Sequence, residues 1–269
     1  MVDVVLVVLR RPELAESLLH AGERMAKLMD GARLNVLALH EPIQLSGLAA
    51  EALIEEAESV VRARQHEQDQ IAALRRSFDG WVRDAEADAH WVEGDGSAPA
   101  IIGERGSRAD LIVAGQPLAD DRLARQAFSA ALFGTDRPVL MVPPGNTGAF
   151  GRRVAIAWRD EKRAVKSVIP ALRCLTGAEQ VHVLTGVREG EPNPGIPQVL
   201  LEHGIPAKLH VLPIGRSPFG QMLLDTAHRL SADLLVMGAY AHSPLRELIL
   251  GGVTHYMLDH ADLPVLMRH

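Results

Sequence analysis

Hydrophobic residues along this chain form short continuous runs that alternate with amphipathic segments. Val4–Leu9 is an aliphatic run, typical of a strand that is buried on both faces of a sheet. The residues after it predict a helix, because apolar side chains recur at spacings of three and four: Leu14, Leu18, Ala21, Met25 and Leu28. The alternation continues to the carboxyl end, and it predicts an α/β protein with a parallel, doubly wound sheet between helices.

Each half of the chain is predicted to contain five strands. They are expected near Val4–Leu9, Leu34–Leu39, His90–Val92, Leu111–Ala114 and Val139–Val142, and then near Val154–Trp158, Val181–Thr185, Leu209–Pro213, Leu234–Met237 and Val265–Met267. Helices are expected over a long charged segment from about Ala49 to Phe78, from Ala98, and over an apolar stripe from Val165 to Leu175. In such sheets ligands bind at the carboxyl ends of strands, where the strand order changes.

Two sequence blocks recur in the same order. Ala109–Gly115 and Ala232–Gly238 are identical at five of seven positions, and Arg137–Met141 and Leu263–Met267 share Pro-Val-Leu-Met. The distance from the shared Asp to the shared Pro is 28 positions in the first pair and 31 in the second. This agreement predicts a tandem duplication.

The duplication places a boundary near the middle of the chain. Pro143–Gly148 is rich in turn-forming residues and is predicted to join the halves. The expected domains are residues 1–144 and 151–269. Each is expected to be a doubly wound α/β unit with a Rossmann-like arrangement.

Composition narrows the function classes. Hydrophobic residues are 47% and charged residues 23%, as in globular proteins, while aromatic residues are only 4%. The low aromatic content argues against stacking platforms for single-stranded nucleic acid, and the net charge of −6 argues against a duplex-binding face. No nucleic-acid partner is therefore predicted.

Apolar runs and cysteine usage indicate the compartment. No apolar stretch reaches about 18 residues, and the first run is too short for a signal sequence, so no membrane span is expected. The single cysteine, Cys174, excludes a disulfide framework and is interpreted as a buried small hydrophobe. A soluble cytoplasmic protein is expected.

The segment from Leu234 to Met267 carries the most specific pattern. It is predicted to contain a strand, a loop from Gly238 to Ser243, a helix, a Gly-Gly pair at positions 251 and 252, a second helix and a final strand. It resembles the carboxyl-terminal signature of the universal stress protein family, whose nucleotide-binding members carry Gly-x2-Gly-x9-Gly-[Ser/Thr]. The resemblance covers most of the chain, once per half, and implies two adenine nucleotide alpha hydrolase-like domains that form a pseudo-dimer through their last strands.

Carried over by position, the family pattern is incomplete in the second half. Gly238 and Gly251 match its first and third glycines, whereas Ala241 replaces the second and Gly252 replaces the Ser or Thr. A methyl group at Ala241 opposes positive φ and close approach of a phosphate. The loss of the hydroxyl at Gly252 removes one phosphate donor. Glycines at these places are also ordinary turn residues, so a role in the fold alone is the competing interpretation.

Three further residues complete the candidate nucleotide site. Thr254 is a substitute hydroxyl two residues after Gly252. Asp160 stands where ATP-binding relatives have an acidic residue after the first strand. His242 lies in the glycine loop as a donor to phosphate. The resemblance thus implies ATP or another adenine nucleotide as the ligand.

The first half departs further from the family pattern. Gly115 and Gly134-Thr135 are present, but Leu118 occupies the second glycine position and fifteen residues, not nine, follow it. Arg10-Arg11-Pro12 follows the first strand, with no acid before Glu13. The first half is expected not to bind nucleotide in the family manner.

Known catalytic and metal-binding patterns are missing from the sequence. It has no His-Glu-x-x-His, no Cys pair, no Gly-x-Ser-x-Gly and no P-loop. No catalytic residue and no metal ligand is therefore predicted, and a solvated or capping role is expected for the late histidines, His228, His242, His255, His260 and His269.

The sequence supports three functional hypotheses. The leading one is a non-enzymatic stress-response or regulatory protein that binds an adenine nucleotide in its second half. The alternatives are a ligand-free interaction module with decayed nucleotide loops, and a weak nucleotide hydrolase or transferase. A protein partner would fit the arginine- and glutamate-rich segment from Glu55 to Arg76, and pairing of two chains as a homodimer is a further hypothesis.

Overall fold

The computed structural model describes residues 2–40, 53–118, 121–159, 162–215, 218–239 and 252–269, and the structural statements below concern these residues. Strands and helices alternate along the chain, as the apolar pattern predicts. The first half contains β1 (Val4–Leu9), α1 (Pro12–Leu28), β2 (Arg33–His40), α2 (Leu53–Trp81), β3 (Ala89–Asp95), α3 (Ala98–Gly106), β4 (Leu111–Gly115), α4 (Arg122–Gly134) and β5 (Val139–Val142).

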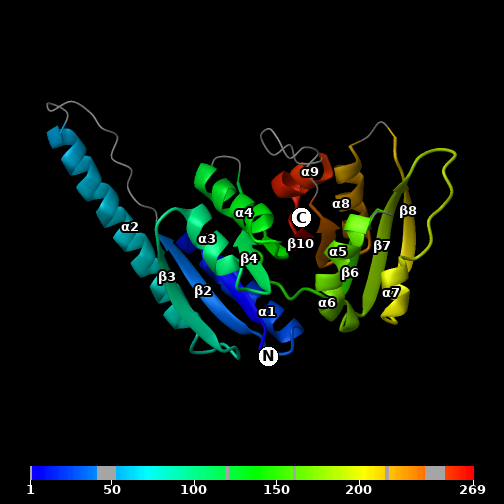
Figure 1. Ribbon diagram of the computed structural model, residues 1–269, viewed down its shortest axis with the longest axis horizontal. Coiled ribbons are helices and arrows are strands. Elements are labelled where there is room, and N and C mark those ends of the chain that lie inside the picture. Colours follow the sequence, from blue (N-terminus) through cyan, green and yellow to red (C-terminus); the bar gives the residue numbers. More distant parts are fainter. Residues whose placement is uncertain (1, 41–52, 119–120, 160–161, 216–217, 240–251) are drawn as a thin grey trace.

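The second half follows the same plan and is coloured green to red in Figure 1. It contains β6 (Arg153–Trp158), α5 (Lys162–Val168), a 3₁₀ turn (Ile169–Ala171), α6 (Leu172–Thr176), β7 (Gln180–Val187), α7 (Gln198–Glu202), β8 (Lys208–Pro213), α8 (Phe219–Arg229), β9 (Leu234–Gly238), α9 (Gly252–His260) and β10 (Val265–Arg268).

All ten of these strands form one sheet, in the order β3-β2-β1-β4-β5-β10-β9-β6-β7-β8. Neighbouring strands are parallel within each half, with β1 between β2 and β4 and β6 between β7 and β9. The prediction of a mostly parallel α/β sheet is confirmed.

The two halves meet through their last strands. β5 and β10 pair antiparallel, with Leu140 opposite Leu266 and Met141 opposite Val265. This is the pairing that the resemblance implied. The pairing covers two sheet edges that would otherwise expose unpaired backbone groups to other chains.

Burial on both faces explains the continuous apolar runs. In β1, Val5, Val7 and Leu9 belong to the core on one face of the sheet, while Leu6 and Val8 belong to the core on the other. Because side chains alternate across a strand, a strand covered on both faces needs apolar residues at every position.

The repeated Ala-Asp block has a structural role. Asp110 accepts a hydrogen bond at 2.9 Å from the backbone N–H of Val4, at the start of β1. Asp233 accepts bonds from Gly151 and Arg152 at 2.7 and 3.1 Å, just before β6. The same carboxylate therefore ties the fourth strand of each half to the beginning of its first strand.

One predicted helix is interrupted. The apolar stripe from Val165 to Leu175 predicts a continuous helix, but the structure has α5, a 3₁₀ turn and α6. Pro170 lies in that turn. Proline lacks the N–H that an α-helix interior needs and its ring collides with the preceding turn, so the helix breaks there.

Other element boundaries move by a few residues. β3 extends from Ala89 to Asp95 and is longer than the expected His90–Val92. The long charged segment is helical from Leu53 to Trp81, and residues 49–52 of the expected helix lie outside the described part. The helix expected directly after Ser243 also lies outside it.

The connector between the halves is attached to the first half. Phe150 is 2% exposed, and its carbonyl oxygen accepts a hydrogen bond at 2.7 Å from Arg24 of α1. β5 ends at Val142 and β6 begins at Arg153, so the turn-rich segment Pro143–Gly148 lies between them. The exact domain limits, 1–144 and 151–269, stay a prediction.

The burial of Cys174 and the length of the helices can be compared with the sequence. Cys174 is fully buried, which confirms its interpretation as a small core residue, and burial raises the pKa of its thiol to about 11. Among the helices of the described part, none is both long and apolar enough to cross a bilayer.

Candidate functional site

Each half has a point where the chain reverses its direction of travel across the sheet. From β1 the chain continues to β2 on one side, and later returns to β4 on the other side. β6 has the same relation to β7 and β9. Ligands of open α/β sheets bind beyond the carboxyl ends of strands at such points, so the molecule has two candidate crevices.

The two crevices face away from each other at the joint. Because β5 and β10 are antiparallel, the carboxyl edge of the first half adjoins the amino edge of the second half there. A residue that follows β4 is thus placed near the end of α9, rather than near its beginning.

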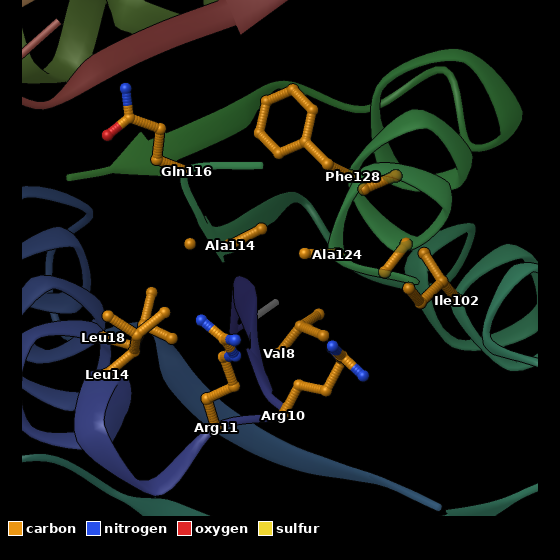
Figure 2. Close-up of a pocket in the computed structure, with 13 residues that line it drawn as sticks. Val8, Arg10, Arg11, Leu14, Leu18, Ile102, Ala114, Gln116, Ala124 and Phe128 are labelled. Atoms are coloured by element: carbon orange, nitrogen blue, oxygen red, sulfur yellow. The ribbon is translucent and has the colours of Figure 1, made fainter. Parts of the chain in front are cut away.

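The first crevice is lined by two arginines and mostly by apolar side chains (Figure 2). Its walls come from β1, α1, β4 and α4, and include Arg10, Arg11, Leu14, Gln116 and Phe128. The cavity holds about 40 Å³. Ligand pockets usually hold about 300–1,000 Å³, so a nucleotide does not fit this cavity as it stands.

A buried carboxylate, Asp121, pairs with the two arginines that line the first crevice. Both carboxylate oxygens of Asp121 accept hydrogen bonds at 2.6 Å from Arg10, and Arg11 Nε lies 3.2 Å from Asp121. The Asp121 side chain is only 6% exposed. Its carboxylate also caps α4 by accepting a bond at 2.9 Å from the backbone N–H of Ala124.

The surroundings keep Asp121 ionised. Burial alone would raise its pKa, but the hydrogen bonds from Arg10 and Ala124 and the charges of Arg10 and Arg11 lower it by more, so the pKa lies below its usual value. An internal anion therefore sits between the two arginines, at the helix N-terminus where an external anion would otherwise bind. This arrangement supports the expectation that the first half does not bind nucleotide in the family manner.

Asp121 was not identified as a functional residue from the sequence. It precedes the helix that begins at Arg122, which is the place of an N-cap, so a search for helix starts could have found it. Its pairing with Arg10, 111 positions away, had no local signal.

Gln116 was also missed. It follows Gly115 directly after β4, is 6% exposed, and its backbone N–H donates to the carbonyl of Val142 at 2.9 Å. Its side-chain Nε2 donates to the carbonyl oxygens of Leu258 at 2.8 Å and Ala261 at 3.3 Å. A polar residue directly after an apolar strand was the available signal, but its partners lie in the other half.

The strand edge of the second crevice is described up to Ala239. Gly238 ends β9 and is buried, and Ala239 is fully buried and donates its backbone N–H to Arg268 at 2.8 Å. Trp158 ends the neighbouring β6 and is 7% exposed. Ala157 pairs with Met237, so Trp158 and Gly238 lie at the same edge of the sheet.

The other described side of this crevice is the beginning of α9. Gly252 is its first residue, and a Cβ added there would meet no atom within 4 Å. Thr254 lies in the first turn and is 3% exposed. The backbone N–H groups of a first helical turn have no intrahelical acceptor and favour anions.

The structure thus describes three of the seven candidate nucleotide-binding residues: Gly238, Gly252 and Thr254. Ala241, His242, Gly251 and Asp160 lie outside the described residues. The three described residues come from the end of β9 and the beginning of α9, and their role in binding stays a prediction.

The remaining described histidines pair with single neighbours. His228 Nε2 lies 2.7 Å from Asp262, and His255 lies 3.3 Å from Asp259, one helical turn away. No group of three or more His, Cys, Asp or Glu side chains with metal-binding geometry occurs among the described residues.

One histidine pair is internal to the second half. His182 Nδ1 and His210 Nε2 lie 3.0 Å apart on β7 and β8, and His182 Nε2 lies 3.2 Å from Gln180. Burial lowers the pKa of both rings, and the charge of Lys208 lowers both further. Neutral rings can share one hydrogen bond, whereas two protonated rings would repel each other.

Comparison with known proteins gives a family match for the carboxyl-terminal part of the chain and related structures for the whole fold. Residues 211–269 match the model of the Universal stress protein family. This segment contains β9, α9 and β10, and therefore the described side of the second crevice. No curated protein matches the chain significantly.

Solved structures resemble the chain over nearly its full length. A universal stress protein from Archaeoglobus fulgidus has a TM-score of 0.67 and 16% identity, over 99% of this chain and 96% of its own. A functionally unknown protein from Pseudomonas aeruginosa PAO1 has a TM-score of 0.61 and 16% identity, over 99% of this chain and 92% of its own. At this identity the likeness establishes the fold.

Proposed function

We propose that this chain, which matches the universal stress protein family model over residues 211–269 and has the fold of such proteins along its length, is a nucleotide-binding regulator. It binds ATP or another adenine nucleotide at the carboxyl edge of β6 and β9. It acts in the cytoplasm as a stress-response protein without catalysing a reaction on the nucleotide.

One observation carries the nucleotide proposal. Gly238 at the end of β9 and Gly252 at the beginning of α9 flank the switch point of the second half, inside the segment that matches the family. Glycines let backbone N–H groups approach phosphates closely, and a helix N-terminus favours their negative charge. In the first half Asp121 caps α4, the helix that follows β4, and pairs with Arg10 and Arg11.

The two departures from the family pattern predict weak binding that can be strengthened. Ser at position 252 would add a phosphate-binding hydroxyl, and the open space around Gly252 accommodates it without a collision. Gly at position 241 would remove the methyl group that opposes positive φ. The double variant Ala241→Gly, Gly252→Ser is therefore expected to bind ATP about tenfold more tightly, since charge-assisted hydrogen bonds are the strong ones.

The experiment combines native mass spectrometry with calorimetry. Heat of ATP binding is expected for the wild-type protein, and tighter ATP binding with co-purified adenine nucleotide is expected for the double variant. Gly148→Ser is the matched control, because Gly148 also has open space around it and lies in the connector. Absence of nucleotide from the wild type, with no ATP heat in either protein, would overturn the proposal and favour the ligand-free interaction module.

The non-catalytic role is tested separately. Phosphate release from ATP above the rate in buffer would contradict it and favour the hydrolase alternative. The proposals of a protein partner and of a homodimer are tested by pull-down and by light scattering of the purified chain.

A further inference from the structure

A buried polar contact between the halves reaches one particular helix. Gln116, at the edge of the first crevice, donates two side-chain hydrogen bonds to carbonyl oxygens at the end of α9, 142 and 145 positions away. The Gln116 side chain is buried, so these bonds form away from bulk water. Figure 2 shows this side chain extending from the end of β4.

The chemistry of a helix end explains why a primary amide suits this place. The last carbonyl groups of a helix have no intrahelical donors and carry partial negative charge. Leu258 and Ala261 present two such groups around the end of α9, and the two N–H bonds of one amide nitrogen can serve both. Gln116 thus acts as a cap that is supplied by the other half.

The first half supplies this cap to the second half, and the equivalent residue of the second half supplies none in return. Gln116 and Ala239 occupy equivalent positions, because each follows the glycine of its fourth strand and donates its backbone N–H to the last strand of its own half. Ala239 has no side-chain donor. The first half therefore holds a helix of the second half, while the equivalent second-half position offers no such bond.

The other end of α9 is the beginning of the candidate nucleotide site. α9 extends from Gly252 to His260, about 13 Å at 1.5 Å per residue. It packs closely on α8, since a Cβ on Gly220 would lie only 2.7 Å from Tyr256 Cβ. A short helix held at one end and packed along its side transmits a displacement of that end to its first turn.

We infer that Gln116 is a positioning residue for the nucleotide site of the second half. It fixes the carboxyl end of α9 and thereby holds the first-turn N–H groups of α9 where phosphates would bind. This inference rests on the proposed nucleotide binding, but the order that Gln116 imposes on α9 can be measured without any nucleotide.

The decisive variant is Gln116→Leu, which keeps the size of the side chain and removes both donors. In the absence of nucleotide, hydrogen exchange of the amides in α9 is expected to accelerate about fivefold. ATP affinity is expected to fall by a similar factor, which corresponds to the loss of about one buried hydrogen bond. Gln126→Leu on the exposed face of α4 is the matched control and should change neither quantity.

Two further variants separate positioning from loss of stability. Leu132→Ala removes a core side chain that is 1% exposed in α4, so it lowers global stability but should leave ATP affinity unchanged. Gln116→Glu places a carboxylate against two carbonyl oxygens. Its ATP affinity relative to wild type should recover at low pH, where a protonated carboxyl can donate one bond.

The outcomes are distinguishable. Unchanged hydrogen exchange in α9 of Gln116→Leu would overturn the inference, as would a loss of ATP affinity in Leu132→Ala equal to that in Gln116→Leu. If wild type binds no ATP, the proposed function fails, while hydrogen exchange still decides whether Gln116 holds α9.

Discussion

The two halves of this molecule share a fold and differ at their ligand edges. In each half an aspartate, Asp110 or Asp233, accepts backbone hydrogen bonds at the start of the first strand. At the opposite edge the first half has Asp121 between two arginines, while the second half has a buried Gly238 at the strand end and an open Gly252 at the helix start.

The comparison of the halves separates residues that stabilise the sheet from residues at the edge where a ligand would bind. Duplicated positions that tie strands together are retained, because each half needs the same backbone bonds. In the first half, Arg10 and Arg11 at the crevice pair with Asp121 of the same half. The second half has Gly238 and Gly251 at the first and third glycine positions of the family pattern, and Ala241 at the second.

The joint between the halves should show the largest effect. Leu140 and Leu266 face each other across β5 and β10 and are 0% and 1% exposed. Replacing either by alanine should lower the free energy of unfolding by about 3 kcal/mol, since a buried leucine leaves a cavity. Urea denaturation of Leu140→Ala and Leu266→Ala measures the loss.

A matched variant and the shape of the transition test the same point. Leu201→Ala, at a residue that is 56% exposed, should change stability by less than about 0.5 kcal/mol. Both joint variants should unfold in one transition, because the sheet is continuous. Two transitions, only one of which moves, would mean that the halves are energetically independent.

The closed crevice should show the next largest effect. Asp121→Ala leaves Arg10 and Arg11 without their shared carboxylate and removes the cap of α4, at an expected cost of about 2 kcal/mol. Glu104→Ala is the control, because Glu104 is 60% exposed and its ion pair with Arg108 is expected to contribute little.

The pH dependence of that effect follows from the lowered pKa of Asp121. A carboxylate with a lowered folded-state pKa stabilises above its unfolded value of about 3.9, and this stability is lost as pH falls through the folded-state pKa. The gap between wild type and Asp121→Ala should therefore narrow below about pH 4. A gap that stays constant down to pH 2 would contradict the charge-based account.

The smallest effect is expected from the histidine pair of the second half. Burial and neighbouring charges lower the pKa of His182 and His210, so the unfolded chain binds more protons just below pH 6.5. Stability should decrease as pH falls from 7.5 to 5.5, and His210→Gln should reduce that decrease by less than about 1 kcal/mol.

Much of this fold is encoded in local patterns. Continuous apolar runs such as Val4–Leu9 and Val139–Val142 predict their strands to the residue, because both faces of those strands are buried. The resemblance to the universal stress protein family implies that β5 and β10 meet. The break at Pro170 also had a local signal, but a strong apolar stripe on both sides of it favoured a continuous helix.

The candidate site was predicted less completely, for a physical reason. The spacing of the family pattern identifies Gly238 and Gly251 as its first and third glycines, since phosphate binding places demands on the local backbone. Gln116 and Asp121 act through partners more than 100 positions away, and such pairings arise from the tertiary fold. A single sequence contains no local periodicity that reveals them.

Calorimetric titration of the intact wild-type chain with ATP tests the central claim most directly. The account predicts one ATP bound per chain, in the second half, and an unchanged stoichiometry in Asp121→Ala at a pH and temperature where that variant is folded. Two ATP molecules per chain would show that the first crevice opens, and no heat at all would show that neither half binds nucleotide. Either result would contradict the account.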